Sequence, residues 1–286
     1  MEPLHEGMQV SLASRHRDRS DKHYEADFAD RWTQWHDEHE RQRARPHGFL
    51  AITGLHWLDE ILRRFEDVPG AWSTTLDGVD VVLGENEELN IEDVRVIEHY
   101  HFANVDEQGT TAQFGDAIVE VALRDGHFMI RPRDPNNEVR VRYAGTPTFE
   151  ASLDWVTHGR LVPFAEPRSV SVGASVEGLS QVYMSPGEVQ FQLVGQEFCL
   201  VAFSDDAPAE LFFVFRDATA GDTTYAKCRF LRADAPDSDA RVILDFNRAT
   251  NPPCAYTDFA TCPLRPEGND LPVRIEAGEK MPLMSH

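Results

Sequence analysis

Two hydrophobic patterns divide this chain, one with the spacing of a helix near the N-terminus and one with the alternation of strands over most of the rest. In residues 21–45, aromatic positions recur at Tyr24, Phe28, Trp32, Trp35 and His39. This spacing places them on one face of a helix, which Pro46 and Gly48 end. The pattern predicts an amphipathic helix docked on the main body. We expect a helical segment over residues 21–66 after a flexible arm of residues 1–20. The spacing of Leu55, Leu58, Leu62 and Phe65 is compatible with a short second helix, although Gly54 and the β-branched residues before it suggest that a strand comes first.

From residue 67 onward, short runs alternate between apolar and polar residues, as in half-buried strands. Turn-forming pairs such as Asp125-Gly126 and Val194-Gly195 separate them. The runs are VDVVLG, VRVIEHYHF, AIVEVAL, HFMIRPR and EVRVRY, and then RSVSVGASV, EVQFQLV, EFCLVAF, ELFFVF, TTYAKCRFL and RVILDF. We therefore predict an all-β fold of two antiparallel β-sets, residues 67–150 and 151–286, as a sandwich or barrel with the N-terminal amphipathic helix.

The charge and the hydrophobicity of the chain make some binding partners and locations less favourable than others. The 286 residues carry a net charge of −22, which disfavours nucleic acid and anionic membranes because like charges repel. No apolar run is long enough for a membrane span and no secretory signal is recognisable, so we expect a cytoplasmic protein. The chain has 24 Arg and three Lys, which fits either a high-salt cytoplasm or a high-GC genome.

The polar faces of the last strands hold the best candidates for chemistry. Alternation puts Tyr225 and Arg229 on one face of TTYAKCRFL, and Asp245 and Asn247 on one face of RVILDFN. Arg216 ends the preceding apolar strand. If these strands pair, the side chains line one concavity. Ordinary ion pairs on a solvated sheet face would give the same pattern.

The segment NPPCAYTDFATCPL, residues 251–264, fits neither a helix nor a strand. Long irregular segments are usually functional or disordered, and the prolines here restrict the backbone. We predict an ordered loop that folds over the strand ends and closes a site. Asp245 is the candidate catalytic base, paired with Arg229 or Arg216 because a buried carboxylate needs a partner. The substrate-binding candidates are Arg216, Tyr225, Arg229, Asn247 and Asn251.

Two of the four cysteines, Cys254 and Cys262, lie in this loop. Three interpretations stay open: packed free thiols, a disulfide bond that would need an oxidising compartment, and a metal or catalytic site. No histidine adjacent in the sequence supplies a base for a nucleophilic thiol. Cys199 and Cys228 lack the close spacing of zinc ligands.

Other metal signals are weak. His99 and His101 share one face of a predicted strand, as two metal ligands would, although such pairs are more often half-exposed histidines. The HDEHE stretch lacks the four-residue spacing of H-E-x-x-H. Neither a Walker loop nor a dinucleotide fingerprint is present. We predict no structural zinc and no cofactor.

Four stretches together resemble a family of bacterial and archaeal proteins known only as a domain of unknown function. They are GLHWLDE (54–60), FRDATAGDTTYAKCRFL (215–231), DFNRATNPPCAYTDFATCPL (245–264) and NDLPVRIEAGEK (269–280). The likeness spans roughly residues 25–282 and includes the G-L-x-W-L, D-F-N-x-A-x-N-P-P-C and C-P-L-x-P motifs. The resemblance implies membership of the family and no particular activity.

We therefore expect a protein that binds or acts on a small polar or anionic molecule at a C-terminal Arg/Tyr/Asp/Asn pocket. Arg216 and Arg229 would bind its anionic part. The alternative is a non-catalytic interaction or structural β module in which the loop only closes the fold. A buried, convergent cluster of these residues favours the first function, and residues splayed into solvent favour the second.

Overall fold

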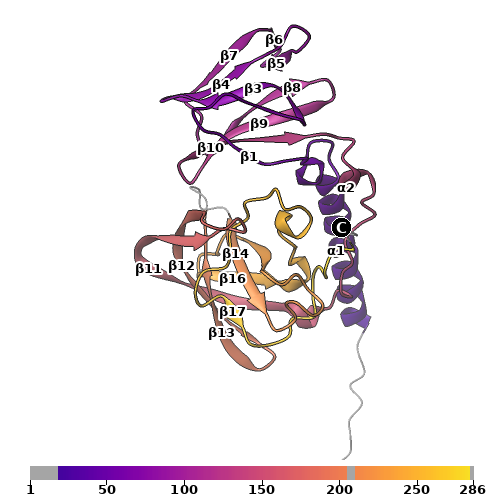
Figure 1. Cartoon of the computed structure of the whole chain (residues 1–286). Helices are drawn as coiled ribbons and strands as arrows, with labels where there is room; N and C mark the ends of the chain where they lie inside the picture. Colours follow the sequence, from indigo (N-terminus) through magenta and orange to yellow (C-terminus); the bar gives the residue numbers. More distant parts are fainter. Residues whose placement is uncertain (1–18, 205–209, 284–286) are drawn as a thin grey trace, which may run out of the picture.

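The computed structural model describes residues 19–204 and 210–283, and most of them lie in β-strands. Figure 1 shows two β-bodies stacked on each other, with the long helix α1 (Arg19–Arg43) running beside the second body. Of the predicted N-terminal arm, residues 1–18 lie outside the described residues. Within the described ranges, no helix combines the length and the apolar character that a membrane crossing requires.

The first body is a sandwich of two antiparallel sheets with the strand orders β1-β10-β9-β8-β5-β6 and β2-β3-β4-β7. Its strands are β1 (His56–Trp57), β2 (Arg63–Phe65), β3 (Val68–Thr74), β4 (Gly78–Val82), β5 (Leu89–Ile91), β6 (Val94–Val96), β7 (His99–Ala103), β8 (Thr110–Phe114), β9 (Ala117–Arg124) and β10 (His127–Arg133). Both sheets contribute to one core, with Trp72 and Val81 from one sheet and Val119 and Ile130 from the other, all fully buried. This packing removes the apolar faces of both sheets from water.

The second body consists of a four-stranded sheet, β13-β12-β11-β16, and a three-stranded sheet, β15-β14-β17. Its strands are β11 (Val156–Gly173), β12 (Ser180–Leu193), β13 (Gln196–Ala202), β14 (Glu210–Asp217), β15 (Arg229–Asp234), β16 (Arg241–Asp245) and β17 (Asp270–Leu271). Leu200 from one sheet and Phe213 from the other share a buried core. In the part of the chain described, no sheet closes on itself, so the predicted mostly-β fold is confirmed and the barrel alternative is not.

Two hairpins follow the predicted turn chemistry. β9 and β10 are joined at Asp125 and Gly126, which have φ of 48° and 76°, and β12 and β13 at Val194 and Gly195, with φ of 46° and 77°. Two consecutive residues at positive φ give the hairpin turn whose twist matches that of paired strands. Glycine adopts this conformation without strain.

Two segments differ from the prediction. EVRVRY forms the short helix α2 (Glu138–Val141) because Asn137 caps it, its side chain accepting a hydrogen bond from the Val139 N–H. Residues 56–65, where a second helix was expected, form β1 and β2, which pair with β10 and β3. The spacing of apolar residues therefore gave the wrong element in both segments. A local cap decides the first, and pairing with other strands decides the second.

A buried asparagine joins the two sheets of the second body. The amide of Asn269, which is fully buried, accepts a hydrogen bond from the Val201 N–H at 2.8 Å and donates to the Val201 carbonyl at 3.1 Å. It also donates to the carbonyl of Val214 at 2.9 Å. The side chain therefore satisfies backbone groups of β13 and β14 where these two strands do not pair directly.

Replacing Asn269 with alanine will destabilise the protein. Three buried backbone groups would lose their partner, and each unsatisfied group costs about 1–3 kcal/mol. We expect a loss of about 3–5 kcal/mol in the free energy of unfolding, measured by urea denaturation. The exposed Glu267→Ala variant serves as the control. A loss for Asn269→Ala no larger than that of the control would contradict this role.

Candidate functional site

Helix α1 contacts the second body through partly buried aromatic side chains. The indole N–H of Trp32 donates to the Asn247 carbonyl at 3.0 Å, and the guanidinium of Arg248 lies 5.5 Å from the centre of the Trp35 ring. Of the predicted stripe, the side chain of Tyr24 lies outside the described residues. The contacts of the remaining stripe place the middle of α1 against the turn that follows β16.

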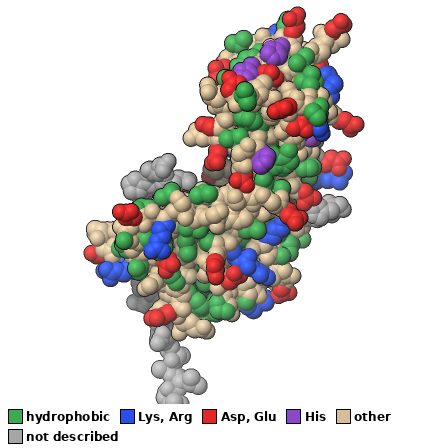
Figure 2. Space-filling model, turned by 60° about the vertical axis from the view of Figure 1, so that its left-hand side comes forward, with side chains coloured by type: hydrophobic (Ala, Val, Ile, Leu, Met, Phe, Trp, Pro, Cys, Tyr) green, Lys and Arg blue, Asp and Glu red, His purple; other side chains and the backbone are tan. Residues whose placement is uncertain are grey.

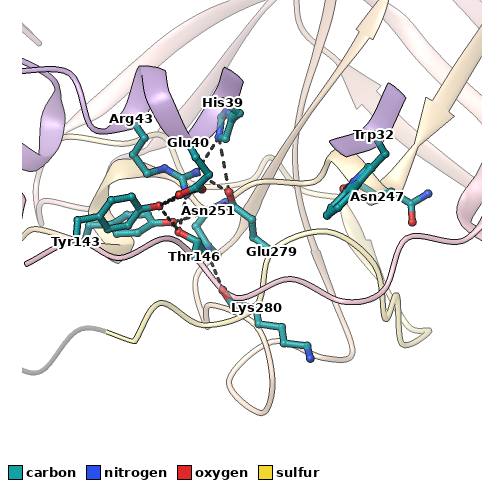
Figure 3. A network of polar contacts seen from close by, with 11 residues as sticks. Trp32, His39, Glu40, Arg43, Tyr143, Thr146, Asn247, Asn251, Glu279 and Lys280 are labelled. Carbon is teal, nitrogen blue, oxygen red and sulfur yellow. Dashed lines mark hydrogen bonds and ion pairs between the residues drawn. The ribbon is translucent and has the colours of Figure 1, made fainter. Parts of the chain in front are cut away.

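A buried polar network holds the C-terminal end of α1 (Figure 3). Arg43 donates to Glu279 at 2.6 Å, to the Thr146 hydroxyl at 2.6 Å and to the Tyr143 hydroxyl at 3.0 Å. The other carboxylate oxygen of Glu279 accepts the Asn251 N–H at 2.6 Å. The side chains of Arg43 and Glu279 are each 2% exposed. The network thus joins the helix, the start of the loop and the C-terminal segment.

Burial changes the protonation of this network. It raises the pKa of the Glu279 carboxyl, against the opposing effects of Arg43 and the Asn251 N–H. Burial, together with the positive charge of Arg43, lowers the pKa of His39 to about 4. His39 lies within hydrogen-bond distance of Arg43, at 2.8 Å. A neutral imidazole nitrogen is able to accept that bond, whereas an imidazolium is not.

Between α1 and the strands β15 and β16 lies a cleft of about 940 Å³. Its aromatic lining comes from Phe28, Trp32, Trp35, Phe49 and Phe230, and its charged lining includes Arg31, Arg232, Arg248, Glu210, Asp234 and Asp245. On β16 the side chains alternate, with Val242 and Leu244 in the core and Ile243 and Asp245 toward the cleft. The sequence predicted this alternation.

Asp245 does not form the predicted ion pair with Arg229 or Arg216. Its carboxylate caps the turn Phe246–Arg248, accepting the Asn247 N–H at 3.1 Å and the Asn247 side-chain amide at 2.8 Å. Its other oxygen lies 3.3 Å from Nε of Arg248. β16 is an edge strand, and local partners satisfy the carboxylate.

Arg229 is part of the core. Its guanidinium pairs with Asp217 at 2.6 Å, both side chains being 1% exposed, and it donates to the carbonyls of Ile275 and Ala277. The strand alternation turns Arg229 inward, and Asp217 at the end of β14 lies opposite. Arg216 precedes Asp217, and its backbone pairs with Asp270 of β17. These arginines therefore do not converge with Asp245.

The other three predicted residues also lie apart. Tyr225 precedes β15, which begins only at Arg229, and its hydroxyl donates to the Cys254 carbonyl at 2.9 Å. Asn247 is 1% exposed and bonds both backbone groups of Ser152. Asn251 lines the cleft, donates to the Lys280 carbonyl at 2.7 Å, and has a buried Oδ1 without a hydrogen-bond partner. Only Asp245 and Asn251 share one cavity.

The predicted loop packs firmly against the body. Tyr256 is 2% exposed, and its hydroxyl lies 2.8 Å from the hydroxyl of Thr146. Sequence reasoning missed the loop's main anchors, Arg43 and Glu279. A signal existed for Arg43, because it continues the helical stripe four residues beyond His39. Glu279 stands in the AGEK stretch of the last motif, but nothing in the pattern marked it as buried.

All four cysteines are free thiols. Figure 2 shows histidines on the surface of the first body. His99 and His101 of β7 lie beside Asp80, at 3.4 Å and 2.7 Å. Among the residues that the structure describes, no group of three or more His, Cys, Asp or Glu side chains is placed to hold a metal ion. The two histidine side chains are 55% and 32% exposed, as in the half-exposed pair that sequence reasoning also weighed.

Asp245 and Asn251 of the cleft lie in the second half of the chain, as does Glu279. Residues 141–280 match the family described as "Protein of unknown function (DUF1684)". The DUF1684 match includes the last three motifs quoted above and excludes GLHWLDE. The solution NMR structure of an uncharacterized protein from Haloarcula marismortui is similar, with 32% identity over 51% of this chain and 81% of that chain, and a TM-score of 0.43. A comparison with curated proteins found no match.

The Glu279→Gln variant should be strongly destabilised. Glutamine keeps the shape but removes the more deeply buried of the two carboxylates that pair with Arg43, leaving only Glu40 at 2.9 Å, and we expect a loss of about 3 kcal/mol. Urea denaturation at neutral pH measures the loss. Glu276→Gln, an exposed carboxylate three residues earlier, should change the stability by less than about 1 kcal/mol. Equal effects of the two variants would show that the network does not hold the fold together.

Because of His39, the folded state should be less stable in mild acid. Its pKa is about 4 in the folded protein instead of an ordinary 6.5, so between these pH values the unfolded chain binds a proton that the folded chain does not. Stability therefore falls as the pH falls through this window, by up to about 1.4 kcal/mol per pH unit. Urea denaturation from pH 7.5 down to about 5 should show a shallower slope for His39→Gln than for wild type. The control is His47→Gln, outside the network, and a slope unchanged by His39→Gln would refute the assignment.

Proposed function

We propose that the protein binds a small molecule with a flat apolar part in the cleft between α1 and the strands β15 and β16. The cleft itself is the observation that carries this proposal. Its volume of about 940 Å³ falls in the range of small-molecule sites, which combine apolar walls with a few polar groups. The rings of Trp32 and Trp35 supply one wall, and Phe230 and Ile243 supply the opposite one.

The charges in the cleft favour an uncharged or weakly charged ligand over the anionic one expected from the sequence. Each arginine has an acidic partner: Arg31 with Asp27 at 3.2 Å, Arg232 with Glu210 at 3.5 Å and Arg248 with Asp245 at 3.3 Å. A paired guanidinium attracts a further anion only weakly, because the neighbouring carboxylate opposes it. Arg229, the predicted anion-binding residue, is fully engaged by Asp217.

Polar groups in the cleft lining support a ligand that also forms hydrogen bonds. The side chain of Arg248 is 41% exposed and lines the cleft together with Glu210 and Asp234, so these groups are able to meet a bound molecule. Arg248 Nε lies within ion-pair distance of Asp245 but does not reach hydrogen-bond geometry with it. Asp245, 18% exposed on the cleft wall, remains the candidate catalytic residue if the bound molecule is also a substrate.

Binding can be tested with a flat, uncharged aromatic probe, N-phenyl-1-naphthylamine, whose fluorescence rises on apolar surfaces. Ile243 is 57% exposed and lines the cleft, so Ile243→Arg should obstruct the site without disturbing the core. Val182→Arg is the matched control, because Val182 is 66% exposed on β12 and outside the cleft lining. We expect saturable binding by wild type and the control, weakened about tenfold or more in Ile243→Arg.

A thermal-shift screen of nucleotides, sugars and aromatic metabolites would then search for the natural ligand, since a ligand that binds the folded state raises its stability. Hits should stabilise wild type and Val182→Arg but not Ile243→Arg. If the probe binds all three proteins equally, or none of them, the cleft is not a binding site. The non-catalytic interaction or structural module would then be favoured.

A further inference from the structure

A second cavity lies on the opposite side of the loop and contains a pair of thiols. It has a volume of about 420 Å³ and is lined by Ser175, Tyr225, Lys227, Cys254, Ala255, Thr257, Asp258, Ala260, Met281 and Pro282. Cys254 is partly exposed, whereas Cys262 is buried. The Cys254 N–H donates to the sulfur of Cys262 at 3.2 Å. One thiol therefore faces the cavity and the other stands directly behind it.

The loop is held so that the two sulfurs stay together. The Tyr225 hydroxyl donates to the Cys254 carbonyl at 2.9 Å, and the Ser175 N–H donates to the Cys262 carbonyl at 2.7 Å. Because the sulfur of Cys262 lies 3.2 Å from the backbone nitrogen of Cys254, the two thiols are close neighbours across the loop.

We propose that Cys254 and Cys262 form a dithiol–disulfide redox pair, in which Cys254 attacks a low-molecular-mass disulfide that enters this cavity. The cavity is too small for a folded partner, and a second thiol in contact with the first is what resolves a mixed disulfide. An isolated nucleophilic cysteine would need no such neighbour. This site is separate from the cleft, so the two proposals stand or fall independently.

The chemistry is two successive thiol–disulfide exchanges. The Cys254 thiolate forms a bond to one sulfur of R–S–S–R, whose own sulfur–sulfur bond breaks, and R–S⁻ leaves with the electron pair and takes a proton. Cys262 then loses its proton and attacks the sulfur of Cys254, which expels the second R–S⁻. The two thiols are oxidised by two electrons, and the small disulfide is reduced to two molecules of R–SH.

The electrostatics fit these separate roles. A hydrogen bond from Cys262 lowers the pKa of Cys254 to about 7 against the effect of burial, and Tyr225 and Lys227 lower it further. The bond to Cys254, together with burial, raises the pKa of Cys262, so this thiol stays protonated until Cys254 has reacted. Asp258 also lines the cavity and opposes the positive charge of Lys227.

The chain contains its own control thiol. Cys199 is also partly exposed, but burial and a hydrogen bond to Glu188 raise its pKa to about 12. In wild-type protein at pH 7, iodoacetamide should modify Cys254 about 100-fold faster than Cys199, allowing for the lower intrinsic reactivity of a low-pKa thiolate. Peptide mapping by mass spectrometry follows both sites in the same sample and needs no variant. Equal rates, or a slower Cys254, would overturn the proposal.

The resolving step is tested with an aromatic disulfide, dithiobis(nitrobenzoate). Wild type should release two equivalents of the coloured thiol rapidly and finish with a Cys254–Cys262 disulfide and no adduct. Cys262→Ser should release one and keep a stable mixed disulfide on Cys254, and Cys254→Ser should lose the fast phase. Cys228→Ser, which removes a nearby buried thiol, should behave as wild type. A stable adduct on wild-type Cys254 would overturn the pair.

Discussion

The carboxylate of Glu279 is the contact on which the rest of the second body's irregular structure depends. One oxygen binds Arg43 of α1 and the other binds the Asn251 N–H, so a single buried group fixes a helix and a loop to the C-terminal segment. A carboxylate with 2% exposure is stable in the interior only when its lone pairs are satisfied. The helix and the loop are therefore not independent elements, and the cleft between α1 and β16 exists because both are held at fixed positions.

The loop of residues 251–264 contributes to the linings of two separate cavities. Asn251 and Pro253 line the large cleft, whereas Cys254 and Ala255 line the smaller cavity. A regular strand or helix in this place would present a repeating surface, but a loop fixed by prolines and side-chain bonds presents different groups on each side. This accounts for a long irregular segment that is nonetheless well packed, and for the position of Asn251 and Cys254 in the linings of different cavities.

The sequence predicted the positions of the strands better than it predicted the contacts between their side chains. Alternation put Asp245 on the face of β16 opposite to Leu244, as the structure has it, because period-two burial is a local property of a strand. It could not predict that Arg229 would pair with Asp217, since that choice depends on which residues the sheet brings together. The residues predicted to form the site do not converge: among them only Asp245 and Asn251 line the same cleft, and their role there stays a prediction. That Cys254 and Cys262 lie close together could be predicted only as one of three alternatives. The number of residues between two cysteines in a loop does not determine the distance between their sulfurs.

The abundance of arginine over lysine has a structural use at the buried positions. Arg43 bonds to side chains on two segments outside its own helix, Arg229 joins Asp217 to two backbone carbonyls, and Arg131 binds Glu120 through two nitrogens. A guanidinium offers five donors in a fixed plane, whereas an ammonium is a compact charge that is more costly to desolvate. Lysine at any of these positions would leave carbonyl or carboxylate oxygens unsatisfied. In this protein, buried arginines thus donate hydrogen bonds to carboxylate and carbonyl oxygens that the strands and loops do not satisfy.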